Sequence, residues 1–148
     1  MFIQEAENLY RLWVPFEKIA TSVFLLLTPE GPVLYDCATT AEDVERVILP
    51  ALERMHIAPA QLRALVISHA HGDHNGGMAM LLQHAPQLKV IARKQTENGF
   101  VPKDGETLFG DAEIYDCTMD GVHPNDLGFN HMAQTLYPVL KEALGMEA

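Results

Sequence analysis

The chain has few cysteines, few basic residues and no long apolar run. Two cysteines, Cys37 and Cys117, are too few for a disulfide framework, so we expect a reducing compartment. Ten lysines and arginines against twenty acidic residues give a formal net charge of −10, which argues against nucleic acid and anionic membrane surfaces as partners. The longest apolar stretch, Val23 to Leu27, is too short to span a bilayer, and no signal peptide is visible at the amino terminus. Together these absences predict a soluble cytoplasmic protein.

The remaining composition is typical of a globular domain. Hydrophobic residues make up 48% of the 148 positions and charged residues 20%. A chain of this length can bury a core of its own, so we expect a single domain over residues 1–148.

Histidine and aspartate gather in one short stretch of the chain. Three of the seven histidines lie at His69, His71 and His74, and Asp73 stands between the last two. The stretch follows the apolar run 64–67, which is typical of a buried strand. Neutral imidazoles with a carboxylate suit zinc, or iron or manganese where carboxylates contribute more. The sequence therefore predicts a metal site in the loop after this strand.

The spacing within the stretch indicates two points of convergence. His69 and His71, two positions apart in an extended segment, can face one ion. Gly72 lets the backbone turn, so Asp73 and His74 can face a second point nearby. A pair of metal ions clamping a bridging water is the natural interpretation. The alternative is a polar loop whose histidines are fortuitous.

His-Ala-His-Gly-Asp-His, between a strand and a Gly-Gly pair that opens a helix, resembles the metal-binding signature of the metallo-β-lactamase superfamily. The hairpin that ends in residues 33–36 agrees with this resemblance, which covers about residues 1–95. It implies an α/β (α+β) fold, an incomplete αββα sandwich with a single mixed sheet and flanking helices. It also implies that Asp36 lies under the metal loop; a purely local capping role for Asp36 is equally open.

Local patterns predict the individual elements of this half. We expect an edge strand over Leu9–Val14, a hairpin of Ser22–Leu27 with Pro32–Asp36, a helix that begins at Thr40 with Asp43 completing a capping box and that is kinked by Pro50, a helix over Gly76–Gln83, and a buried strand over Leu88–Ala92.

The resemblance also implies ligands farther along the chain. A third histidine, a bridging aspartate and a final histidine are expected downstream of the signature. His123 is the candidate for the third metal ligand, although its neighbours differ from the usual Pro-Gly-His context, and Asp126 could stand in as the bridging carboxylate. The final histidine has no candidate.

The tail has a different character. Residues 120–129, followed by an amphipathic helix that Gly145 would end, resemble the last block of the SGNH (GDSL-type) hydrolases; the resemblance spans about residues 105–145. It implies that Asp120 orients His123 as a general base toward a serine. Only Ser22 and Ser68 are present, and neither stands in a Gly-Asp-Ser context. Two partial signatures suggest a chimera of a 1–95 half and a 105–148 segment, joined near 95–110; a divergent single family with a coincidental tail is the alternative.

Three functional hypotheses follow. The first is a metal-dependent hydrolase, in which His69, His71 and His123 bind one ion and Asp73 and His74 bind a second ion or orient the attacking water. A metal-bound hydroxide would then attack the ester, thioester or amide-like carbonyl of a small molecule. The alternatives are a half-domain that binds metal weakly without turnover, and a serine esterase fragment with Asp120 and His123 but no nucleophile. Whether the chain is an enzyme stays open, and an uncovered sheet face would favour a homodimer.

Overall fold

The computed structural model describes residues 1–16, 18–69, 71–92, 117, 119 and 125–145. The chain divides into two compact units, Met1–Arg93 and Lys94–Ala148. The prediction of a single domain, and that of a join near residues 95–110, therefore stay predictions.

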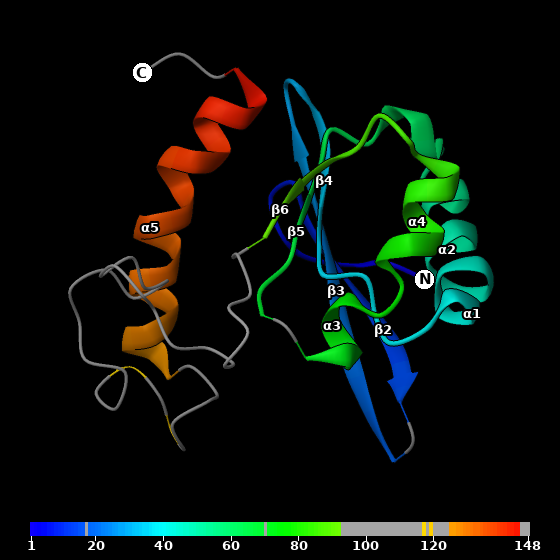
Figure 1. Cartoon of the computed structure of the whole chain (residues 1–148), viewed down its shortest axis with the longest axis horizontal. Coiled ribbons are helices and arrows are strands. Elements are labelled where there is room, and N and C mark those ends of the chain that lie inside the picture. The colour runs from blue at the N-terminus through cyan, green and yellow to red at the C-terminus, as the bar shows by residue number, and fades with distance from the viewer. Residues whose placement is uncertain (17, 70, 93–116, 118, 120–124, 146–148) are drawn as a thin grey trace. The chain divides into compact units, whose positions relative to one another are not determined.

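A six-stranded mixed sheet forms the first unit (Figure 1). Its strands follow the chain in order: β1 (Ile3–Ala6), β2 (Leu9–Phe16), β3 (Ile19–Thr28), β4 (Gly31–Tyr35), β5 (Ala64–Val66) and β6 (Lys89–Ile91). The first four strands are antiparallel neighbours, whereas β4, β5 and β6 run parallel to one another. The predicted class, a single mixed sheet with flanking helices, is confirmed.

The hairpin of β3 and β4 is confirmed as well, with Thr28 paired to Gly31 across the turn. The edge position predicted for the strand that begins at Leu9 is wrong, because β1 lies outside it. Pro15 is nevertheless tolerated in β2, since β1 pairs only with residues 9–11 and Pro15 faces β3 alone.

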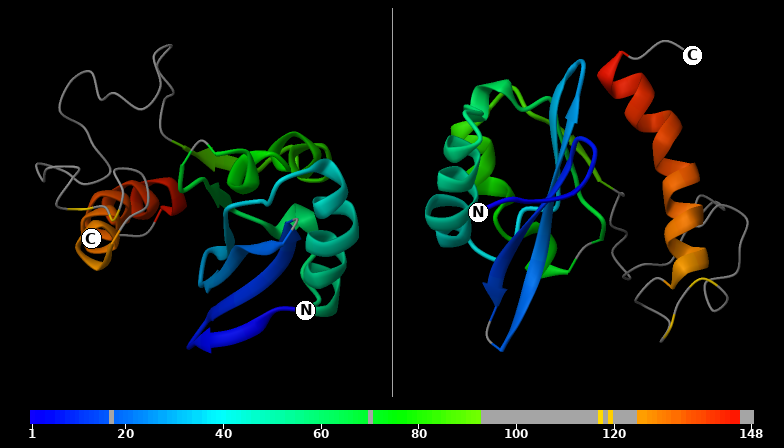
Figure 2. Two further views of the ribbon diagram at one scale, coloured as in Figure 1. Left: turned by 90° about the horizontal axis from the view of Figure 1, so that it is seen from below. Right: turned by 180° about the vertical axis from the view of Figure 1, so that it is seen from behind.

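The core lies between one face of the sheet and the helices. In the register Leu25 is opposite Leu34, which is opposite Leu65, so these fully buried side chains share one face. They pack in one cluster with side chains of the helical segments, among them Ile48, Leu52 and Leu81. Figures 1 and 2 show α1, α2 and α4 on the same side of the sheet.

The helical segment after β4 begins where its cap predicts. α1 (Ala41–Asp43) is capped by Thr40, and Asp43 completes the capping box. The chain continues through the π-helical η1 (Val44–Ile48) into α2 (Leu49–Arg54), whose first turn contains Pro50. The sequence predicted a kink at Pro50, and in the structure the wider turns of a π-helix lie just before this residue. The short 3₁₀ turn η2 (Pro59–Gln61) leads toward β5.

Two short helices follow β5, namely α3 (Gly72–Asn75) and α4 (Met78–His84). The sequence predicted only the second of them. The strand predicted over Leu88–Ala92 is present as β6, but it is not buried: Lys89 and Val90 are exposed and Ile91 is half-buried, because β6 forms an edge of the sheet.

In the second unit the described structure is mainly one helix, α5 (Asp126–Leu144). The Asn125 side chain caps its start by accepting a hydrogen bond from the Gly128 amide, and Gly145 ends it in a left-handed conformation, as predicted. Along α5, Phe129 is 57% exposed, whereas Met132 is buried. Among the described residues, no helix is long and apolar enough to cross a membrane.

Candidate metal centre

Two loops at the carboxyl ends of neighbouring strands build the candidate site. The β4 loop (residues 36–40) and the β5 loop (residues 67–69 and 71) follow parallel strands, so both start at the same end of the strands. Backbone hydrogen bonds hold the β4 loop against the elements on either side of the β5 loop: the amide of Asp36 donates to the carbonyl of Val66 in β5, and that of Cys37 to the carbonyl of His74 in α3, both at 2.8 Å. The histidines are therefore held against a second loop that contributes no histidine.

The Asp36 carboxylate is the centre of the polar contacts. It is 3% exposed, and its Oδ1 accepts from the Ser68 amide at 2.8 Å. Its Oδ2 accepts from the Ser68 hydroxyl at 2.8 Å and from His74 Nδ1 at 2.7 Å. Asp36 has a φ of 63°, a left-handed conformation that aspartate tolerates better than most residues. All three partners lie more than thirty positions away, so a purely local capping role is wrong.

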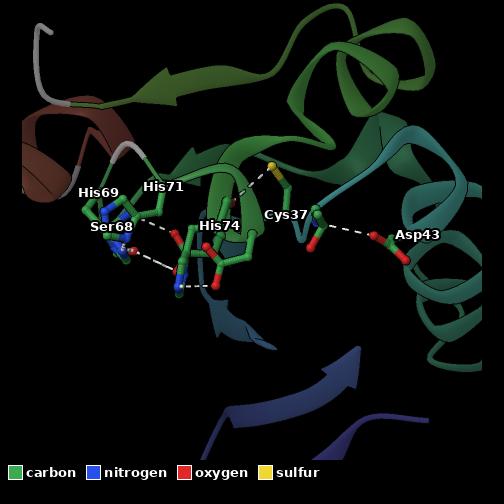
Figure 3. A network of polar contacts seen from close by, with 9 residues as sticks. Cys37, Asp43, Ser68, His69, His71 and His74 are labelled. Atoms are coloured by element: carbon green, nitrogen blue, oxygen red, sulfur yellow. Dashed lines mark hydrogen bonds and ion pairs between the residues drawn. The ribbon is translucent and has the colours of Figure 1, made fainter. Parts of the chain in front are cut away.

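His69 and His71 lie side by side in the polar network (Figure 3). His69 Nε2 is 3.1 Å from His71 Nδ1, and the ring centroids are 4.6 Å apart. Two nitrogen ligands at about 2.0–2.1 Å from one tetrahedral zinc ion are about 3.3 Å apart. The separation of these two nitrogens therefore fits a shared metal ion.

Asp73 and His74 extend the cluster from α3. The His74 ring lies 4.1 Å from the His69 ring, and its Nε2 is 3.3 Å from Asp73 Oδ2. His74 is thus flanked by two carboxylates, Asp36 on Nδ1 and Asp73 on Nε2. All four residues that the sequence predicted in this stretch lie close together.

The surroundings shift the pKa values of the two half-buried imidazoles, His69 and His74, in opposite directions. Burial, followed by the charges of His74 and His71, lowers the pKa of His69 to about 4. Burial also opposes protonation of His74, but the hydrogen bond to Asp36 and the charges of Asp36 and Asp73 raise its pKa overall. His69 is therefore neutral at pH 7, which is the state that binds a metal ion.

Cys37 contributes no ligand despite its position beside the site. Burial and the Asp36 charge raise the pKa of its thiol to about 12. A thiol that stays protonated is a poor metal ligand.

The described residues fit a metal ion only in part. Among them, no three histidine, cysteine, aspartate or glutamate side chains converge so as to hold an ion. The His69–His71 pair supplies two nitrogens with suitable spacing, and His69 is neutral at pH 7. His123, the predicted third ligand, and Asp120, its predicted partner, lie outside the described residues, while Asp126 is the first residue of α5.

Two features of the site escaped the sequence interpretation. Ser68, weighed there only as a nucleophile, instead links Asp36 to His69 through its hydroxyl. Gly76 and Gly77 allow the β4 loop to approach: a Cβ on Gly76 would lie 1.8 Å from the Thr39 carbonyl oxygen, and one on Gly77 2.2 Å from that of Cys37. The Gly-Gly pair after the histidines was the available signal for this contact.

The chain is similar in sequence to known proteins. Residues 17–125 match the family model described as the metallo-beta-lactamase superfamily. A hydroxyacylglutathione hydrolase of Synechococcus is 34% identical over 92 residues, which cover 58% of this chain and 34% of that protein. The transcription termination factor FttA of Methanosarcina mazei is 33% identical over 83 residues, covering 55% of this chain and 13% of that protein. The chain thus spans about a third or less of these relatives.

Solved structures show the same likeness. A metallo-β-lactamase of Cronobacter sakazakii with a HARLDQ motif is 27% identical and has a TM-score of 0.50, covering 60% of this chain and 32% of that one. A mutant of that protein is 29% identical with the same TM-score. The family match extends to residue 125, past the predicted join and into the segment that resembles SGNH hydrolases. The SGNH resemblance and the chimera are not shown by these comparisons and stay predictions.

Proposed function

Because the chain belongs to the metallo-β-lactamase superfamily, we propose that it is a metal-dependent hydrolase. The observation that carries this proposal is the pair His69 Nε2 and His71 Nδ1, 3.1 Å apart at the carboxyl end of β5. Several relatives are named hydroxyacylglutathione hydrolase, and an acyl group on the sulfur of glutathione is a thioester. Among the ester, thioester and amide-like carbonyls that such a site can act on, a thioester is therefore favoured.

The residues have separate roles in this proposal. His69 and His71 hold the metal ion, and a further ligand comes from outside the described residues, with His123 as the candidate. A bound zinc ion, or iron or manganese in its place, supplies a Lewis acid that polarises a carbonyl and lowers the pKa of water. Asp73 Oδ2, half-buried beside His74, can accept a hydrogen bond from a water and so orient it.

A second candidate function is metal binding without turnover. It is favoured because no third ligand joins His69 and His71 within the described residues. Both candidate functions require the chain to bind a metal ion, and only the hydrolase requires turnover.

Metal content after purification without chelators tests the shared premise. We expect about one to two equivalents of metal in the chain, and loss of metal in His71→Ala. His84→Ala is the matched control, because His84 is an exposed histidine at the end of α4 and is not among the predicted ligands. A chain without metal, or a His71→Ala variant that keeps it, would contradict the proposal. Hydrolysis of an acylglutathione by the metal-loaded chain, absent in His71→Ala, then separates an enzyme from a binding module.

A further inference from the structure

Ser68 occupies a position that the proposed reaction does not explain. Its side chain is buried between a carboxylate and two imidazoles (Figure 3). The hydroxyl oxygen lies 2.8 Å from Asp36 Oδ2, 2.9 Å from His69 Nδ1 and 3.5 Å from His74 Nδ1. The first two distances are hydrogen bonds of normal length, whereas the third is long.

Counting hydrogens assigns the direction of these bonds. A carboxylate only accepts, so the hydrogen between Ser68 Oγ and Asp36 Oδ2 is the hydroxyl hydrogen of Ser68. A hydroxyl has one hydrogen, and this one is already donated. In the bond to His69 Nδ1 the hydroxyl oxygen must therefore accept, so His69 Nδ1 carries a proton.

We propose that Ser68 is a positioning residue that transmits the charge of Asp36 to His69 and fixes His69 in the Nδ1–H tautomer. A neutral imidazole carries one proton, so with Nδ1 protonated its Nε2 offers a lone pair. Nε2 is the atom that faces His71 Nδ1 at 3.1 Å. Ser68 thereby turns the metal-binding nitrogen of His69 into an electron-pair donor.

The tautomer of the neighbouring His74 is also fixed by Asp36, but by direct contact and without an intervening hydroxyl. Its Nδ1 donates directly to Asp36 Oδ2 at 2.7 Å. One buried carboxylate thus orients two imidazoles, His74 by direct contact and His69 through a hydroxyl.

The same assignment excludes Ser68 as a nucleophile activated by these histidines. A general base must accept the hydroxyl proton, but both imidazole nitrogens near Ser68 Oγ, His69 Nδ1 and His74 Nδ1, carry protons of their own. The Ser68 hydroxyl is already committed to Asp36.

The tautomer can be measured directly in the metal-free chain of 148 residues. Long-range ¹H–¹⁵N correlation spectra distinguish a protonated from an unprotonated ring nitrogen, and the His69 signals are assigned by their loss in His69→Gln. In chelator-treated protein at about pH 8, where a histidine with a pKa near 4 is neutral, we expect Nδ1 of His69 to be protonated and Nε2 not. A His69 ring protonated on Nε2 would overturn the proposal without any variant.

Variants then test the relay itself. Ser68→Ala removes the acceptor, so we expect the His69 proton to redistribute between Nδ1 and Nε2, while Ser68→Thr restores the Nδ1–H form. Ser22→Ala is the matched control, since Ser22 is the only other serine and lies in β3. An unchanged His69 tautomer in Ser68→Ala would contradict the relay. Should that variant not fold, the wild-type and Ser68→Thr spectra still decide the question.

The consequence for metal binding rests on the proposed function and is measured separately. We expect Ser68→Ala to bind zinc about 10-fold more weakly, in line with the loss of a group that orients a ligand, and Ser68→Thr to bind as the wild type does. If His69 has the Nδ1–H tautomer but the wild-type chain binds no zinc, the proposed function fails while the inference about Ser68 stands. If zinc binds and His69 is protonated on Nε2, the reverse holds.

Discussion

The β4 loop and the β5 loop start at the carboxyl ends of neighbouring parallel strands, but they differ in burial and in chemistry. In the β4 loop, Asp36, Cys37 and Ala38 are at most 3% exposed, and Asp36 and Ala38 both have a left-handed backbone. In the β5 loop, His69 is half-buried and His71 is exposed. One loop supports and the other presents the reactive groups.

This difference teaches where stability and function are separated in the site. A left-handed alanine such as Ala38 costs energy that only the surrounding contacts can offset. The supporting loop therefore depends on tight packing, and changes there should reduce stability. Changes to the presenting loop should instead alter metal binding. The predictions below test this division from the largest expected effect to the smallest.

The largest effect is expected from Gly76→Ala, which would push the β4 loop away from the end of α3. The new methyl group would lie 1.8 Å from the backbone oxygen of Thr39, and a backbone atom cannot move aside as a flexible side chain can. We expect the free energy of unfolding to fall by about 3 kcal/mol or more. Trp13, the only tryptophan, lies in β2 of the same unit, so its fluorescence in a urea titration reports this loss.

Gly72→Ala is the matched control for that substitution. Gly72 is the first residue of α3, and a Cβ there would meet no atom within 4 Å. Its stability should stay within about 0.5 kcal/mol of the wild type. Equal losses of stability in the two variants would show that the close approach of the β4 loop is not what requires glycine at position 76.

A smaller but still large effect is expected from Asp36→Asn. Asparagine tolerates the left-handed backbone of position 36, so the change isolates the side-chain contacts. Its amide nitrogen would face a donor, because every observed partner of the carboxylate donates. We expect a loss of about 2–4 kcal/mol in the free energy of unfolding, measured as for Gly76→Ala.

Asp43→Asn provides the comparison at a carboxylate that is only partly buried. Asp43 completes the capping box of α1, and its hydrogen bonds with the Thr40 amide and hydroxyl are open to solvent. A loss of about 1 kcal/mol or less is expected. If this substitution cost as much as Asp36→Asn, the buried carboxylate would not be the centre of the site.

The sequence predicted the elements that have local signals. The capping box at Thr40, the turn between Thr28 and Gly31, and the end of α5 at Gly145 all depend on residues within a few positions of one another. The apolar run before the histidines likewise predicted β5 and the place of the candidate ligands. The structure places His69, His71, Asp73 and His74 in one cluster, and their role as metal ligands stays a prediction.

The contacts that complete the site could not be predicted in the same way. Asp36 reaches Ser68 and His74 across 32 and 38 positions, and no local pattern encodes such pairs. β1 was missed because all its residues are exposed, which leaves no alternation of polar and apolar side chains. The four-residue α3 is too short to show a helical period.

The smallest expected effect is on the pH dependence of stability, to which His69 in the β5 loop contributes. Its pKa is about 4 in the folded chain against an ordinary value of 6.5, so between these values the unfolded chain binds a proton that the folded chain does not. The contribution of His69 is therefore complete above pH 6.5 and falls as the pH drops toward 4. His74, whose pKa is raised, has the opposite sign: its contribution is present at low pH and is lost as the pH rises through its folded pKa.

Comparison with His69→Gln isolates this contribution. In metal-free protein, the free energy of unfolding of the wild type minus that of the variant should decrease from about pH 7.5 to about pH 5, by about 1 kcal/mol or less, because His69 is only half-buried and solvent screens its neighbours. Urea titrations followed by Trp13 fluorescence at each pH measure it. A difference that stays constant would mean that the presenting loop leaves His69 as accessible to protons as in the unfolded chain, and the contrast between the two loops would then rest on Asp36 alone.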